Sequence, residues 1–423
     1  MTQRATLADA IGCLSDYDPR ALAVHDAQRI IERFVTPVEA IERVAIREAL
    51  DRVLASDLIS TIDVPAHDNS AMDGYAVRSV DLVNKGETAL TIVGTATAGR
   101  PLDASIGPGQ AARIMTGAVM PPGTDTVVVQ EIVRTEGQIV HIPAGQAPGQ
   151  NRRLRGEDLS RGKPAIAAGK RLTPADLGLI ASLGVAEVPV RRRLRVAFFS
   201  TGDELRSIGE ALGPGQVYDS NRYTLHGMLS RLGVEIIDMG VVPDDPQSLE
   251  DAMRIAGESA DAVISSGGVS VGEADFTREV MAKLGDVAFW TIGMRPGRPM
   301  AFGRVGKACY FGLPGNPVAV MVTFYFFARE ALMRMMGATA IRLPYVRARS
   351  MSGIRKKPGR TEYQRGILEV GTDGSMQVRL TGGQGSGVLR SMSEANCIVV
   401  LHHDQDSVAA GEPVDCLAFD GLV

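Results

Sequence analysis

The clearest pattern of hydrophobic and polar positions lies between residues 193 and 340. Short apolar runs that are typical of buried strands alternate there with longer segments of helical periodicity. The apolar runs are 195–199, 235–239, 261–264 and 308–311. Capping residues predict helices that begin at 219–221, 245–246 and 316–317 and end at Gly233, Gly257 and Gly337. This alternation predicts a doubly wound α/β domain with its site at the carboxyl ends of the strands.

The segments on either side of this domain have different patterns. Residues 20–57 are rich in Ala, Leu, Ile, Arg and Glu, which predicts mostly helix, and a further helix is expected between Thr173 and Gly184. Short strand-like runs separated by Gly and Pro turns predict β structure in two other regions. These runs are 89–93, 126–130 and 138–142 in one region and 346–349, 366–370, 376–380 and 398–401 in the other. The C-terminal region is expected to be a small β-barrel, and residues 1–18 a flexible tail.

Composition and charge restrict the class of protein. Of 423 residues, 45% are hydrophobic and 22% are charged, and 45 basic against 49 acidic residues leave a formal charge of −4. A chain this balanced is not expected to bind nucleic acid or an anionic membrane through its overall field. The four cysteines form no C-x-x-C pair, and we find neither a secretory signal nor an apolar stretch that could span a bilayer. We therefore expect a soluble, cytoplasmic protein without a disulfide framework or a structural zinc site.

Three glycine-rich loops follow strands of the predicted α/β domain, at 200–204, 265–275 and 312–317. Glycine lets backbone N–H groups approach an anion, and the following helix adds a favourable dipole. The acids in the same loops would repel a phosphate unless a divalent cation lay between them, so the combination predicts a magnesium–phosphate site. Those acids are Glu204, Glu273 and Asp275. The alternative is a set of ordinary tight turns with capping acids, but three such loops at one sheet edge favour the anion site.

Other segments are less informative by themselves. No G-x-G-x-x-G motif follows the first strand of the α/β domain, which disfavours ordinary dinucleotide binding. The segment nearest to a P-loop, 156–164, has the wrong spacing, which disfavours P-loop hydrolysis. The polar segments 68–76, 113–117 and 152–158 could each be an Asx turn or a solvated connector. His402–His403 is assigned no function, because adjacent residues on a strand point to opposite faces.

Taken together, eight segments resemble one family, the molybdopterin molybdenumtransferases, to which the E domain of gephyrin is related. They are DNSAMDGYAVR (68–78), RIMTGA (113–118), NRRLRGED (151–158), FSTGDEL (199–205), SSGGVSVGEADF (265–276), RPGRP (295–299), GLPGNPV (312–318) and QGS (384–386). They occur in the order of the family and cover nearly the whole chain from about residue 20. Eight ordered motifs are far more specific than a single glycine-rich loop.

The resemblance implies an elongated homodimer with four domains in each subunit. An all-helical linking domain would be formed by 19–60 and 155–192, with a β domain (61–154) inserted between these two stretches. An α/β domain that binds molybdopterin would span 193–340, and a C-terminal β-barrel would span 341–423. Because two of the motifs lie in the inserted domain, we expect the active cleft to form between subunits.

The resemblance also implies the reaction and the residues that carry it. Family members insert molybdate into the dithiolene of adenylylated molybdopterin with Mg²⁺-dependent release of AMP, the final step of molybdenum cofactor biosynthesis. The matching catalytic residues are Asp73, Thr116, Glu204, Asp244 and Asp275, and the matching metal ligands are Asp275 and Glu204. The matching substrate-binding residues are Arg153, Asp158, Ser200, Thr201, Gly202, Gly267, Gly268, Ser270, Arg295, Arg298, Pro314, Gly315, Asn316, Pro317 and Ser386. The chain departs from bacterial relatives at Thr291 and Arg295, where lysine is common.

Two other functions are alternatives at this point. The first is the molybdopterin adenylyltransferase that makes the substrate, because its single domain resembles residues 193–340. The second is a non-enzymatic scaffold like gephyrin, which would not need the four matching acids. The partners that the resemblance implies are the adenylyltransferase and downstream proteins that modify the cofactor or assemble molybdoenzymes. No nucleic acid or membrane partner is expected.

Overall fold

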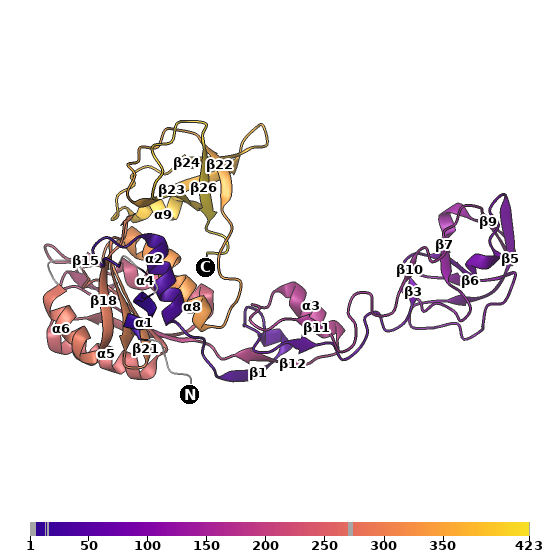
Figure 1. Ribbon diagram of the computed structural model, residues 1–423, viewed down its shortest axis with the longest axis horizontal. Helices are drawn as coiled ribbons and strands as arrows, with labels where there is room; N and C mark the ends of the chain where they lie inside the picture. Colours follow the sequence, from indigo (N-terminus) through magenta and orange to yellow (C-terminus); the bar gives the residue numbers. More distant parts are fainter. Residues whose placement is uncertain (1–5, 13, 15–16, 270–273, 423) are drawn as a thin grey trace.

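The computed structural model describes residues 6–12, 14, 17–269 and 274–422, without the side chains of 274–276. The chain forms an elongated molecule (Figure 1). The α/β domain and the C-terminal barrel lie at one end, the inserted β domain lies at the other, and a small linking domain lies between them (Figure 1).

The α/β domain is built on a six-stranded sheet with the order β16-β13-β17-β21-β20-β18. Its strands are β13 (Arg195–Thr201), β16 (Glu235–Val242), β17 (Ala262–Ser266), β18 (Gly285–Thr291), β20 (Pro299–Val305) and β21 (Ala308–Leu313). The four strands from β16 to β21 are parallel, whereas β20 is antiparallel to both of its neighbours, β21 and β18. The predicted α/β domain is confirmed, and its sheet is mixed because two strands that we did not predict extend one edge.

Helices cover both faces of this sheet, which explains why its central strands are nearly continuous apolar runs. They are α4 (Ser220–Leu232), α5 (Pro246–Ser259), α6 (Ala274–Leu284), α7 (Pro317–Thr323) and α8 (Arg329–Met335), with a π-helical turn at Phe324–Ala328. Gly233 ends α4 in the left-handed conformation, as expected. Gly257 does not end α5, which continues to Ser259. A Cβ at Gly257 would lie 2.8 Å from the Val305 carbonyl oxygen, so this glycine serves close packing.

The N-terminal segment is not a loose tail in the part that the structure describes. Helix α1 (Leu7–Ile11) begins with a capping box, and Leu7 and Ala10 are buried in the same core as α2 (Val24–Phe34). The backbone N–H of Leu7 also donates to the Asp286 carboxylate at 2.9 Å. The expected flexible tail was wrong here, because a short apolar stripe holds one helical turn against the α/β domain.

The linking domain corrects the expectation of an all-helical region. Strand β1 (Ile41–Ala45) pairs with β12 (Glu187–Arg191), and β2 (Leu58–Ile59) pairs with β11 (Pro164–Ile166). Helix α3 (Pro174–Ser182) has the expected Thr173 cap, and a 3-10 turn covers Ile46–Glu48. Helix α2 packs on the α/β core instead. Helix propensity is a weak preference, and antiparallel pairing between stretches distant in sequence overrides it here.

The inserted domain is a β domain, as expected. Its sheet has the order β7-β4-β6-β5-β9-β8. The strands are β4 (Gly74–Val77), β5 (Glu87–Ala96), β6 (Gln110–Ile114), β7 (Thr126–Val129), β8 (Arg134–Glu136) and β9 (Ile139–Pro143), with 3-10 turns at Ser79–Asp81 and Gln130–Ile132. A ribbon of β3 (Asn69–Ser70) and β10 (Arg152–Arg153) leads from the linking domain into this sheet.

The C-terminal domain is the predicted small barrel. Its strands are β22 (Val346–Ser350), β23 (Thr361–Val370), β24 (Met376–Leu380), β25 (Cys397–Leu401) and β26 (Pro413–Ala418), and α9 (Leu389–Glu394) adds one helix. The five strands close into a ring through pairing of β23 with β25. A short strand of the α/β domain, β19 (Met294–Arg295), also pairs with β23 and joins the two domains. Across the described ranges, no helix is both long and apolar enough to cross a membrane.

Candidate active site

A cavity of about 790 Å³ lies at the carboxyl ends of β13, β17 and β21. The loops after these strands form much of its wall, which the start of α4, the Arg295–Arg298 segment and the barrel segment 384–386 complete. The predicted site residues that line it are Thr201, Gly202, Glu204, Asp244, Gly267, Gly268, Arg295, Arg298, Pro314, Gly315, Asn316, Pro317 and Ser386. The three glycine-rich loops therefore meet at one sheet edge.

Glycine brings the main chain of these three loops close together. Gly267 has a φ of 98°, and a Cβ there would lie 2.4 Å from the Thr201 carbonyl oxygen. A Cβ on Gly315 would lie 3.9 Å from the Cα of Gly267. The backbone N–H of Gly267 donates to the Leu313 carbonyl at 3.1 Å. A side chain at Gly267 would therefore strain the backbone and push the loops apart.

Acidic side chains gather in one part of the cavity wall. Burial, together with the charge of Asp203, raises the pKa of Asp244, although a 3.4 Å hydrogen bond from the Thr201 hydroxyl opposes this shift. The charge of Glu204 acts in the same upward direction on this pKa. A bound cation would relieve this repulsion, so these oxygens suit a divalent metal ion. Within the described residues no three Asp, Glu, His or Cys side chains could hold a metal by themselves, so phosphate or water oxygens would have to complete its coordination.

Basic side chains lie in another part of the wall, on the segment between β18 and β20. Arg295 and Arg298 both line the cavity, and Arg295 belongs to β19, where it is paired with Glu362 of the barrel strand β23. The barrel therefore fixes the main chain that carries Arg295. Two guanidinium groups offer forked N–H donors that suit a phosphate or another tetrahedral oxyanion.

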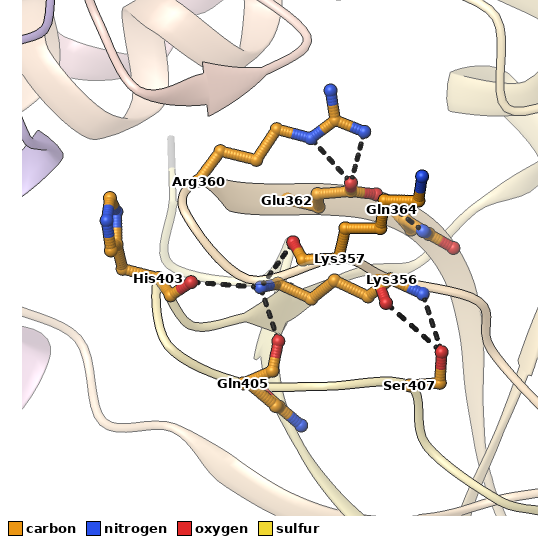
Figure 2. Close-up of polar contacts among 8 residues, drawn as sticks. All are labelled: Lys356, Lys357, Arg360, Glu362, Gln364, His403, Gln405 and Ser407. Carbon is orange, nitrogen blue, oxygen red and sulfur yellow. Dashed lines mark hydrogen bonds and ion pairs between the residues drawn. The ribbon is translucent and has the colours of Figure 1, made fainter.

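A buried polar cluster supports this end of the barrel (Figure 2). The Lys356 ammonium group donates to three backbone carbonyl oxygens over 2.6–3.3 Å, those of Lys357, His403 and Gln405. Burial lowers the pKa of Lys356. The Glu362 carboxylate accepts from Nε of Arg360 at 2.8 Å. The Lys356 contacts tie the segment that precedes β23 to the 403–407 loop, and the Arg360–Glu362 contact lies beside them at the start of β23 (Figure 2), the strand that pairs with Arg295.

Arg365 of β23 is a functional candidate that the sequence did not mark. Its guanidinium group is buried and donates to the carbonyl oxygens of Gly383 at 3.1 Å and Gly385 at 3.0 Å. Burial, with a smaller effect from the charge of Arg295, lowers the pKa of Arg365 to about 10. Arg365 therefore holds the barrel segment of the cavity wall and places a positive charge behind it. A single arginine next to a strand-like run gives no signal of this role.

Asn221 is the second candidate that we did not predict, because its segment indicated only the start of a helix. Asn221 is buried at the start of α4 and lines the cavity. Its Nδ2 donates to the Ser266 hydroxyl at 2.9 Å and to the Gly315 carbonyl at 2.6 Å. Asp219, not Asn221, caps the helix, since its carboxylate accepts from the backbone N–H of Arg222 at 3.0 Å.

Some predicted residues lie outside the cavity. Asp73 and Thr116 belong to the inserted domain at the opposite end of the molecule (Figure 1). Oδ1 of Asp73 accepts from the backbone N–H and from the hydroxyl of Thr116, both at 2.7 Å, and these bonds lower the pKa of Asp73. Arg153 lies in β10, and Asp158 follows on the connection back to the linking domain.

The remaining predicted residues are Ser200, Ser270 and Asp275. Ser200 is buried within β13 and does not line the cavity. Ser270 and the side chain of Asp275 lie outside the residues that the structure describes.

Three family models match the chain. The model described as the MoeA N-terminal region (domain I and II) matches residues 22–184. The model of a probable molybdopterin binding domain matches residues 197–334, and that of the MoeA C-terminal region (domain IV) matches residues 347–419. The matches follow the order of the domains seen in the structure.

Individual proteins are similar over nearly the whole chain. The molybdopterin molybdenumtransferase of Haemophilus influenzae is 41% identical over 397 residues, which cover 93% of this chain and 98% of that protein. The corresponding protein of a Nostoc species is 38% identical over 413 residues, 95% of this chain and 94% of that protein. The crystal structure of the molybdopterin biosynthesis moeA protein from Pyrococcus horikoshii has a TM-score of 0.82 at 28% identity and covers 95% of this chain and 100% of that chain.

Proposed function

This chain belongs to the molybdopterin molybdenumtransferase family, and on that premise we propose how its cavity performs the reaction. The enzyme inserts molybdenum into molybdopterin, the final step of molybdenum cofactor biosynthesis. Its substrates are molybdate and adenylylated molybdopterin. The observation that carries the proposal is that glycine-rich loops, acidic residues and basic residues surround one cavity.

We place the diphosphate of adenylylated molybdopterin against the loops after β13 and β17. Backbone N–H groups there, with glycine at the closest approach, suit phosphate oxygens. Glu204 and Asp244 would hold Mg²⁺, with Asp275 as a further predicted ligand, and the ion would neutralise the diphosphate from which AMP departs. The hydroxyl of Thr201 orients the Asp244 carboxylate through their 3.4 Å hydrogen bond.

We place molybdate beside the basic residues, next to the loop after β21. Arg295 and Arg298 would hold its oxygens by charge-assisted hydrogen bonds, and Arg365 adds positive charge from behind the wall. Ser386, in the barrel segment of the wall, adds a hydroxyl donor. Molybdate held there can bind the two dithiolene sulfurs, with one of its oxygens leaving as water with the two thiol protons. A second water cleaves the phosphoanhydride, so that AMP leaves and the pterin keeps its phosphate.

We further infer that a second copy of the chain completes the site. Asp73 and Thr116 lie at the end of the molecule opposite to the cavity (Figure 1), so they cannot reach the substrate bound in their own subunit. In a homodimer the inserted domain of one subunit would cover the cavity of its partner and bring these residues to it. The cytoplasmic location and the other protein partners stay predictions.

The two alternative functions fit the chain less well. An adenylyltransferase domain would account for residues 193–340 only, whereas the MoeA N-terminal and C-terminal models match the sequence on both sides. A non-enzymatic scaffold would not need Glu204 and Asp244 in the wall of a cavity.

The test is to incubate the purified protein with adenylylated molybdopterin and molybdate. It should release AMP and yield a cofactor that activates an apo-molybdoenzyme. Removal of divalent cations by EDTA should stop both processes, and added Mg²⁺ should restore them. Unchanged AMP release in EDTA would remove the metal from the proposal, and absence of AMP release under all conditions would contradict the assigned reaction.

A further inference from the structure

We propose that Asn221 is a positioning residue for the molybdate part of the site, an inference that rests on the proposed function. Asn221 is the second residue of α4, and only 7% of its surface is exposed. Its amide nitrogen donates both to the Ser266 hydroxyl and to the Gly315 carbonyl. One side chain therefore joins the start of α4, the end of β17 and the loop after β21.

The loops that Asn221 joins have few side chains with which to fix their separation. They meet through glycine, since a Cβ on Gly315 would lie 3.9 Å from the Cα of Gly267. Their other ties are the 3.1 Å bond from Gly267 N–H to the Leu313 carbonyl and a long 3.4 Å bond from the Ser266 hydroxyl to the Pro314 carbonyl. The 2.6 Å bond from Asn221 is the shortest of these contacts, so we expect it to set the position of the Gly315 carbonyl.

The loop after β21 is in turn connected to the groups assigned to molybdate. The backbone N–H of Val318, at the start of α7, donates to the Ser386 carbonyl at 3.0 Å. The same helix packs against the basic segment, because a Cβ on Gly297 would lie 2.6 Å from Cγ2 of Thr323. A shift of the Gly315 loop would therefore move Ser386 and the segment that carries Arg298, so the effect should fall on molybdate binding.

The needs of helix α4 do not explain why residue 221 is an asparagine. Asp219 already provides the N-cap of α4. Asparagine has a lower intrinsic helix propensity than alanine, leucine or arginine, so helix propensity does not favour it at this position. If packing were its only role, substitution would lower the melting temperature without changing how the rate depends on molybdate.

The experiment compares Asn221→Asp and Asn221→Ala with the parent enzyme and with a control, Thr224→Ala. Thr224 lies one turn further along α4, and its hydroxyl donates at 3.0 Å to the Ser220 carbonyl of the same helix. Asparagine and aspartate have the same shape, but an aspartate carboxylate cannot donate to the Gly315 carbonyl. For each protein, molybdenum insertion is measured against molybdate concentration, with the melting temperature determined in parallel.

We expect the half-saturating molybdate concentration to rise about tenfold in Asn221→Asp, and kcat at saturating molybdate to stay within about threefold of the parent. Asn221→Ala should show a smaller rise, because water can enter the vacated space and donate to the carbonyl. Thr224→Ala should match the parent in its dependence on molybdate.

Three results would overturn the proposal. They are an unchanged half-saturating concentration in both Asn221 variants, an equal rise in Thr224→Ala, or a loss confined to kcat. Thermal protection by molybdate separates this question from the assigned reaction. Molybdate should raise the melting temperature of the parent and of Thr224→Ala but much less that of Asn221→Asp, whether or not turnover is observed. Equal protection of all three proteins would also overturn the role of Asn221.

Discussion

The cavity of the α/β domain and the Asp73–Thr116 pair of the inserted domain were predicted as parts of one site, yet they are built differently. The cavity is enclosed by strand-end loops, a helix start and a barrel segment of one chain. Asp73 and the exposed Thr116 are hydrogen-bonded to each other on a domain that lies at the far end of the molecule (Figure 1). One part is thus preformed within a subunit, whereas the other would meet its substrate only in the dimer that we propose.

The two parts also differ in the contacts that hold their functional residues in position. In the cavity, the main chain at Gly267 packs closely against a neighbouring loop, and Asn221 and Arg365 donate hydrogen bonds to loop carbonyl groups. These contacts fix the loops before any ligand binds. In the inserted domain, the two bonds from Thr116 orient only the Asp73 carboxylate itself. We therefore expect substitutions of the residues that fix the cavity loops, such as Gly267, to affect both folding and chemistry. Substitutions at Asp73 or Thr116 should affect chemistry with only a small effect on stability.

The largest effect is expected for Asp244→Asn. Loss of the charge should lower AMP release by about 100-fold, because an amide is a poor ligand for a divalent cation. The melting temperature should stay the same or rise slightly, since the raised pKa of Asp244 means that the folded state disfavours its ionised form. Asp245→Asn is a matched control, because Asp245 caps α5 and asparagine caps a helix about as well. Equal losses in the two variants would argue against a special role for Asp244.

A pair of glycine substitutions compares the two regions directly. Gly267 and Gly117 both have positive φ, at 98° and 81°. A Cβ at Gly267 meets a carbonyl oxygen at 2.4 Å, whereas at Gly117 the nearest atom is the Ala98 Cβ at 3.9 Å. Gly267→Ala should cost about 3 kcal/mol in the free energy of unfolding, and Gly117→Ala about 1 kcal/mol. Denaturant unfolding measures the loss of unfolding free energy in each variant. Similar losses would show that the close packing of the main chain at Gly267 does not set the loop geometry.

A smaller effect is expected at Thr116. Thr116→Val keeps the shape and removes one hydrogen bond to Asp73, so AMP release should fall about tenfold, while Thr116→Ser should stay near the parent. The hydrogen bonds lower the pKa of Asp73 in the folded state, so their stabilisation is present above the unfolded pKa and is lost as pH falls through the folded one. The stability difference between parent and Thr116→Val should therefore shrink in acid. A difference that grows in acid would contradict this assignment.

The sequence predicted the α/β domain well because its signals are local. Strand patterns, the Asp219 cap and Gly233 each lie within one element, and the structure places them as expected. The linking domain was mispredicted as helical because its strands are stabilised by pairing between β1 and β12, which no local pattern reports. Arg365 and Asn221 escaped notice for a related reason, since each acts through backbone carbonyls that only the fold brings near.

In the dimer that we propose, one subunit supplies the cavity and its partner supplies Asp73. The most direct measurement mixes two inactive variants, Asp73→Asn and Asp244→Asn, under conditions that exchange subunits, and assays molybdenum insertion. A mixed dimer would contain one cavity with Asp244 intact opposite an inserted domain with Asp73 intact. We predict activity well above that of either variant alone, approaching one quarter of the wild-type value for full random exchange, because half of the dimers are mixed and each has one intact site. Verified mixed dimers with no more activity than the separate variants would show that the partner does not supply Asp73 to the cavity.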